Sequence, residues 1–230
     1  MEKYGKLLQA AIIAFGLLLL GLCIKGGFDN FTNKDRRVTV KGLSEREVDA
    51  NKVTWCITLS ASGDEMRSVI NYVNNKVEGV KKFLKEKGLE GKATITVESP
   101  NVCDNLANYY GDRPPRYAYT VNRTIRVSSN DTKLIDSVKS QEAELIDRDI
   151  ILESSYTSYE YTKFQELKPE MMAEAIANAE KTASQFAENS HSKINKIVEA
   201  GQGEFSIDEG DVPYKKKVRV VSTITYSLKD

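Results

Sequence analysis

An apolar run near the N-terminus constrains this chain more than any other feature. Residues 7–24 read LLQAAIIAFGLLLLGLCI, in which Gln9 is the only polar side chain. About 20 apolar residues in a helix cross the hydrocarbon core of a bilayer. A helix without a polar face also cannot cover the surface of a soluble domain. The run therefore predicts one transmembrane helix within residues 1–25.

The sequence favours an uncleaved signal anchor over a cleaved signal peptide. The run is long for the apolar part of a signal peptide, and Leu22 stands where a small residue would mark a cleavage site. Lys3 and Lys6 precede the run, which favours a cytoplasmic N-terminus. We therefore expect an inner-membrane protein whose body faces the periplasm or the outside, joined to its anchor by a flexible linker at residues 26–36.

Charge and cysteine content exclude several classes of protein. Lys plus Arg and Asp plus Glu both number 33, so the chain has no basic field and nucleic acid is not an expected partner. Three cysteines are too few for a disulfide framework and too scattered for a metal site. Spacing alone leaves open whether Cys56 and Cys103 pair in an oxidising compartment.

The rest of the chain alternates between strand and helix periodicities. Val53, Trp55, Ile57 and Leu59 recur at period two, and the helical pattern that follows ends at Gly88. Expected strands are 38–42, 52–61, 94–97, 117–127, 150–161, 194–200 and 218–228. Expected helices are 64–87, 131–142 and 169–190, with irregular chain at 99–116 and a polar loop at 201–214.

The order strand, long helix, strand, long strand occurs twice, from Lys52 and again from Ile150. Residues 37–230 are therefore expected to form one α+β domain. It would have a mostly antiparallel sheet packed by two long helices and one short helix, in two similar strand-helix-strand-strand units. The two units could share one sheet or build two subdomains.

No cluster of reactive side chains predicts catalysis, a cofactor or a metal. His191, the only histidine, follows the second long helix, where a capping role is favoured. Glu204, Asp208, Glu209 and Asp211 lack the regular spacing of a calcium site, which favours a solvated loop.

The expected role is therefore a non-enzymatic binding module or oligomeric scaffold. Two alternatives remain open. One is a hydrolase whose groups, including Asp112, Arg113 and Asp208, are dispersed in the sequence. The other is an envelope-stress adaptor, although the cytoplasmic tail would be short.

Two sets of residues are candidates for an interface. Tyr109, Tyr110 and Tyr117 flank a Pro-rich segment, and exposed tyrosines suit a binding surface as well as ordinary sheet packing. The second set follows one helix at steps of four and forms a ridge of small side chains, for which close packing inside the domain is favoured over a subunit contact. Its members are Ala175, Ala179 and Ala183.

The chain resembles the SIMPL-domain family, a family of unknown function. The features that carry the resemblance are residues 38–42, the strand at 53–59, the helix ended by Gly88, the segment 109–117 before a long strand, the run AIANAEKTA at 175–183, and the strand at 218–228. The resemblance implies an exported bacterial envelope protein that self-assembles into a homo-oligomer or binds another envelope protein, with no established enzyme activity. The chain departs from the family by its apparent uncleaved anchor and by Asn178, where an acidic residue is common.

Overall fold

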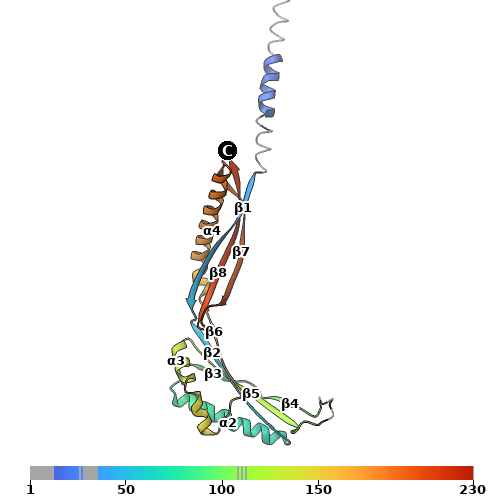
Figure 1. Cartoon of the computed structure of the whole chain (residues 1–230), viewed down its shortest axis with the longest axis vertical. Helices are drawn as coiled ribbons and strands as arrows, with labels where there is room; N and C mark the ends of the chain where they lie inside the picture. Colours follow the sequence, from blue (N-terminus) through green and yellow to red (C-terminus); the bar gives the residue numbers. More distant parts are fainter. Residues whose placement is uncertain are drawn as a thin grey trace, which may run out of the picture. The chain divides into compact units, whose positions relative to one another are not determined.

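The computed structural model describes residues 13–25, 27, 36–107, 109, 111 and 113–229 (Figure 1). They form an α+β protein with two antiparallel sheets. The chain divides into two compact units, each discontinuous in sequence. The first unit comprises Met1–Glu45, Leu167–Ser206 and Arg219–Asp230, and the second unit comprises Arg46–Glu166 and Ile207–Val218.

The predicted membrane segment is only partly described. Residues 13–25 are helical and exposed, while residues 7–12, together with most of the predicted linker, lie outside the described residues. Within the described part of the chain, no helix is both long enough and apolar enough to span a bilayer.

The second unit contains the larger sheet, with strand order β3-β5-β2-β6 and β4 paired to β5. Its strands are β2 (Lys52–Gly63), β3 (Thr94–Val97), β4 (Asn101–Asp104), β5 (Tyr119–Ser129) and β6 (Ser154–Glu160). β2 is the central strand, and it pairs antiparallel with both β5 and β6. The second of the two predicted strand-helix-strand-strand units is split, because β6 pairs with β2 in this sheet whereas the strands that follow residue 190 belong to the other sheet.

Helix α2 (Met66–Glu86) packs on one face of this sheet, with α3 (Thr132–Lys139) and the 3₁₀-helix η2 (Glu142–Arg148) alongside. The period-two residues of β2 supply the sheet side of the core, as predicted, and Trp55 and Phe83 are its largest fully buried side chains. The indole Nε1 of Trp55 donates to Ser155 Oγ at 2.9 Å, so its one polar atom is satisfied.

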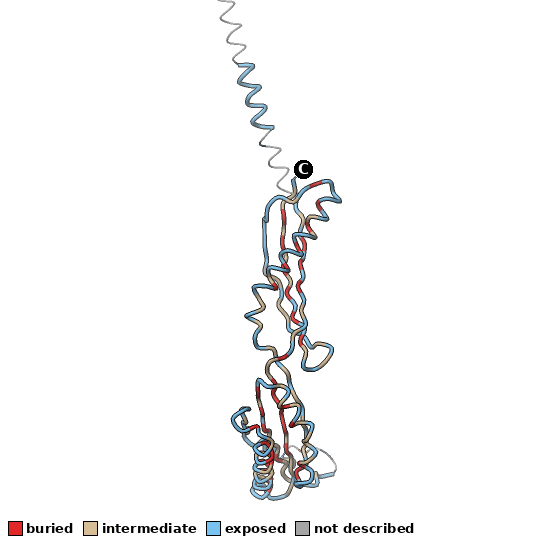
Figure 2. Tube along the Cα trace, turned by 90° about the vertical axis from the view of Figure 1, so that its left-hand side faces the viewer, coloured by how far each residue is buried: buried red, intermediate tan, exposed pale blue. Residues whose placement is uncertain are grey.

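The first unit contains most of a three-stranded sheet of order β1-β8-β7 and the long helix α4 (Phe164–Asn189). Its strands are β1 (Arg37–Asp49), β7 (Lys193–Glu209) and β8 (Lys215–Lys229). Val40, Ala179, Ala183, Ile224 and Tyr226 form the buried cluster between helix and sheet. Buried positions alternate along β1 and β8, while most of β7 is exposed (Figure 2).

Four expectations about element boundaries were wrong. The strand expected at 38–42 continues through Gly42 to Asp49. The predicted polar loop at 201–214 is strand as far as Glu209, because Gly203 is not a turn residue here. A Cβ on Gly203 would lie 2.1 Å from the carbonyl oxygen of Val221, so the glycine lets β7 approach β8 closely. Helix α4 begins at Phe164, which places Pro169 inside it. The segment 99–116, predicted to be irregular, contains β4, a short strand that depends on its partner β5.

Three helices end on a residue in the left-handed conformation. Gly88, Asp149 and His191 have φ of 78°, 57° and 55°. In each case the backbone N–H of the next residue donates to the carbonyl oxygen of the residue five positions before it. The distances are 3.1 Å for Leu89 to Leu84, 2.9 Å for Ile150 to Leu145 and 2.8 Å for Ser192 to Ala187. This is the Schellman motif. His191 thus has the structural role at the helix end that its position predicts.

Replacing His191 with glycine is expected to stabilise the protein by about 1 kcal/mol, because a side chain in the left-handed region costs about that much. Urea unfolding followed by circular dichroism measures the change. His191→Ala, which keeps a Cβ, should stay within about 0.5 kcal/mol of the wild type. A destabilised glycine variant would mean that the imidazole makes a contact of its own.

Candidate binding surfaces

The face of the larger sheet that points away from α2 is lined with hydroxyl groups. Because side chains alternate along a strand, the residues between the core positions of β2, β5 and β6 share this face. We call it the hydroxyl face, and it comprises Thr54, Thr58, Ser60, Ser62, Thr120, Thr124, Ser128, Ser154 and Ser158. Cross-strand pairs bond one another, at 3.0 Å for Thr58–Thr124, 2.9 Å for Ser62–Thr120 and 3.4 Å for Thr54–Ser128.

The middle of this face holds one charged pair and one exposed aromatic ring. Cys56 is buried between Arg126 of β5 and Tyr156 of β6, its direct neighbours across the sheet. Arg126 bonds Glu98 at 2.7 Å, which raises the pKa of the guanidinium, while a hydrogen bond with Cys56 raises the pKa of Tyr156. Tyr156 is 55% exposed, so its neutral ring stands free for contact. No pattern in the sequence predicted the Arg126–Glu98 ion pair.

The register of the strands rules out a disulfide between Cys56 and Cys103. Cys56 lies opposite Arg126, while Cys103 lies opposite Thr120 on the same strand. Arg126 and Thr120 are six residues apart along β5, a distance of about 20 Å. The Cα atoms of a disulfide lie within about 7 Å of each other. Both cysteines are free; Cys56 is buried and Cys103 exposed.

The tyrosines predicted at an interface are only partly placed. Tyr117 is 37% exposed, with the Arg116 guanidinium 5.2 Å from its ring centroid. Tyr109 is half-buried, and its hydroxyl has no hydrogen-bond partner within the described part of the chain. Tyr110 lies outside the described residues, as does Asp112 of the alternative hydrolase site.

The alanine ridge of α4 packs inside the first unit. Ala175, Ala179 and Ala183 are fully buried, as the favoured interpretation of their spacing requires. Gly42 of β1 lies against them, since a Cβ there would be 1.8 Å from the carbonyl oxygen of Ala175. Asn178 donates from Nδ2 to the carbonyl oxygen of Leu43 at 2.8 Å and so ties the helix to β1.

A small cavity of about 210 Å³ lies beside α2 in the second unit. Among its lining residues, Lys76 donates to the carbonyl oxygen of Asp149 at 2.7 Å and lies 5.1 Å from the ring centroid of Tyr72. Ligand sites usually enclose about 300–1,000 Å³. This cavity lies below that range, whereas a second and more open one of about 450 Å³, beside Gly79 and Arg148, lies within it.

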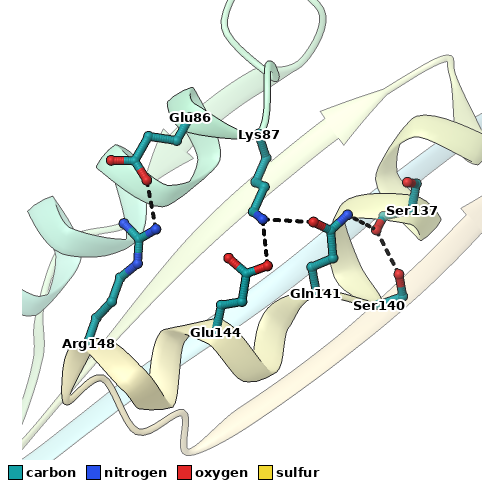
Figure 3. A network of polar contacts seen from close by, with 7 residues as sticks. All are labelled: Glu86, Lys87, Ser137, Ser140, Gln141, Glu144 and Arg148. Carbon is teal, nitrogen blue, oxygen red and sulfur yellow. Dashed lines mark hydrogen bonds and ion pairs between the residues drawn. The ribbon is translucent and has the colours of Figure 1, made fainter.

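Charged groups tie the C-terminal end of α2 to η2 in the second unit (Figure 3). Lys87 Nζ donates to Gln141 Oε1 at 2.7 Å and to Glu144 Oε1 at 2.6 Å. Arg148 donates to Glu86 at 2.7 Å. Lys87 and Arg148 each lie 5.5 Å from the ring centroid of the buried Phe83. The network stabilises the packing of η2 against the end of α2.

The Glu86–Arg148 pair predicts a pH dependence of stability. The hydrogen bond from Arg148 lowers the pKa of Glu86 below its ordinary value of 4.5. A lowered folded-state pKa contributes stability above the unfolded-state pKa, and this contribution is lost as the pH falls through the folded-state value. Glu86→Gln should thus be less stable than the wild type at about pH 7, and the difference should close below about pH 4. Urea unfolding across this range tests it; a constant difference would contradict the coupling.

Three of the four acidic residues considered for calcium lie on a strand rather than in a loop. Glu204, Asp208 and Glu209 lie on β7, and Glu209 pairs with the buried Lys216 at 2.5 Å. Within the described ranges, no three His, Cys, Asp or Glu side chains come together in a way that could hold a metal ion.

The outer edge of β7 is the second candidate surface. β7 ends the sheet order β1-β8-β7, so in the described structure one side of its backbone has no strand partner. It runs for 17 residues without proline. Ile197 and Val198 are 51% and 42% exposed on it. A long edge of this kind is a template for pairing with another strand.

Comparison with known proteins establishes a family without a known function. No curated protein matches the chain. A crystal structure of a hydrolase from Listeria innocua aligns with 12% sequence identity over 81% of this chain and 92% of its own, but its TM-score of 0.23 carries no argument about activity. The model of the SIMPL family, described as "Protein of unknown function (DUF541)", matches residues 38–225. The chain therefore belongs to the SIMPL family, as its sequence pattern indicated.

Proposed function

We propose that this protein is anchored in a membrane of the cell envelope by its N-terminal segment, with its body facing outward, and that it acts as a non-enzymatic binding and assembly module. The anchor rests on the apolar run at residues 7–24. The observation that carries the binding role is the open edge of β7. Strand edges bind partners through the main chain, whereas enzymes usually enclose their substrates in clefts.

The native cysteines give a direct test of anchoring and orientation. Cys103 is exposed on the second unit, whereas Cys56 is buried. A membrane-impermeant maleimide added to intact cells should label the protein in the membrane fraction, and Cys103→Ser should abolish that labelling. Labelling only after permeabilisation would overturn the outward orientation. Recovery of the full-length chain in the soluble fraction would overturn the anchor.

Light scattering of the full-length protein in mild detergent tests assembly. We expect a mass above that of one chain after subtraction of the detergent. A monomer at all concentrations would remove the assembly part of the proposal. Turnover of generic ester, phosphate or peptide substrates by the purified protein would overturn its non-enzymatic part.

A further inference from the structure

The two edges of the smaller sheet differ in how they are protected against pairing. The exposed positions of β1 carry charged side chains at nearly every second residue, which is a common protection of an edge strand. They are Arg37, Lys41, Glu45, Glu47 and Asp49. β7 is exposed without interruption from Asn195 to Gly201, and this stretch includes Ile197 and Val198. β7 is therefore the edge that favours a partner strand.

Two charged side chains on β7 are placed symmetrically about one residue. Lys196 and Glu204 are exposed, and within the described residues neither side chain has an ion-pair or hydrogen-bond partner. Ala200 lies midway between them in the sequence. If two copies of β7 run antiparallel about a twofold axis at Ala200, Lys196 of each copy lies directly opposite Glu204 of the other. Directly opposed residues point to the same face of an antiparallel pair, so both contacts join opposite charges.

We infer that β7 of one copy pairs antiparallel with β7 of a second copy, about a twofold axis at Ala200. This inference rests on the self-association in the proposed function and specifies its interface. An in-register parallel pair would instead set lysine against lysine and glutamate against glutamate. An interface that is the same surface on both copies is the usual form of a symmetric dimer.

The same register gives the exposed isoleucine a place to pack. Ile197 of one copy lies opposite Gly203 of the other, which has no side chain to clash with it. The residues at the axis, Ala200 and its neighbour Gly201, are small and let the two backbones come together. Charge and shape therefore agree on one register.

A cysteine at the axis tests this register. Directly opposed residues of antiparallel strands have Cα atoms about 4.5–5.5 Å apart, within disulfide range. Full-length Ala200→Cys in a Cys23→Ser, Cys103→Ser background, oxidised mildly in detergent, should run as a covalent dimer on a non-reducing gel. Lys41→Cys on the edge of β1 is the matched control and should stay monomeric. Absence of a dimer for Ala200→Cys, or equal crosslinking of both variants, overturns the inference.

Charge reversal tests the paired side chains. Lys196→Glu and Glu204→Lys should each weaken dimerisation by about tenfold, since each places like charges opposite one another twice. The double variant should recover the wild-type dissociation constant, measured by sedimentation in detergent. If the double variant dimerises more weakly than either single variant, the pairing of Lys196 with Glu204 is overturned.

The two proposals can fail separately. A wild-type protein that is monomeric overturns assembly itself. A wild-type oligomer that is insensitive to charge reversal and does not crosslink at residue 200 retains assembly but overturns the β7 interface.

Discussion

Replacing Trp55 with alanine will lower the free energy of unfolding by about 3–5 kcal/mol. The indole is fully buried between the sheet and the helices of the second unit, so its removal leaves a large cavity in that core. It also removes the donor to Ser155 Oγ, which itself bonds Glu142 Oε2 at 2.5 Å. Trp55 is the only tryptophan, so unfolding in urea must be followed by circular dichroism.

Trp55→Phe separates packing from hydrogen bonding. It keeps an aromatic ring in the core but loses the bond to Ser155, and we expect a smaller loss of about 2 kcal/mol. Equal losses for both variants would assign most of the effect to the hydrogen bond. A near-neutral alanine variant would mean that the side chain is outside the core.

Replacing Gly42 with alanine is the second large expected effect, a loss of about 3 kcal/mol in the free energy of unfolding. The added Cβ would lie 1.8 Å from the carbonyl oxygen of Ala175 and 2.6 Å from the backbone nitrogen of Ala179. Backbone atoms cannot rotate away as a side chain does, so α4 and β1 would have to separate. The buried alanine ridge would then lose the contact for which its small side chains are suited.

Gly201→Ala is the matched control. A Cβ there meets its nearest atom, the carbonyl oxygen of Thr223, at an ordinary 3.8 Å. In a strand, alanine should be neutral or stabilising by up to about 1 kcal/mol relative to glycine. Urea unfolding of both variants tests the difference; similar values for the two would show that the contact between helix and strand in the first unit is looser than the distances indicate.

Much of the fold could be predicted because its signals are local. The period-two residues of β2 and the helical stripe that ends at Gly88 lie where the periodicity put them, since burial of one face imposes the pattern within a few turns or pleats. The alanine ridge was likewise visible as a packing surface. Together with the strand order, these features were enough to indicate the family.

The candidate surfaces could be predicted only in part. The tyrosines near the Pro-rich segment were visible as large side chains, but the Arg126–Glu98 pair joins residues that meet only across strand neighbours. The β7 edge was missed because Gly201 and Gly203 were interpreted as turn residues. In the paired strand Gly203 permits close approach to β8, whereas Gly201 occupies an ordinary strand position.

By itself, the sequence determined the apolar N-terminal run, the core faces of β2 and α2, and membership of the SIMPL family, because each depends on residues close together along the chain. Only the tertiary structure decided that β6 joins β2, that β7 continues through two glycines, and that β7 lies at an edge. The physical reason is that a strand's hydrogen bonds are made with another strand, so its length and exposure depend on a partner that the local sequence does not specify.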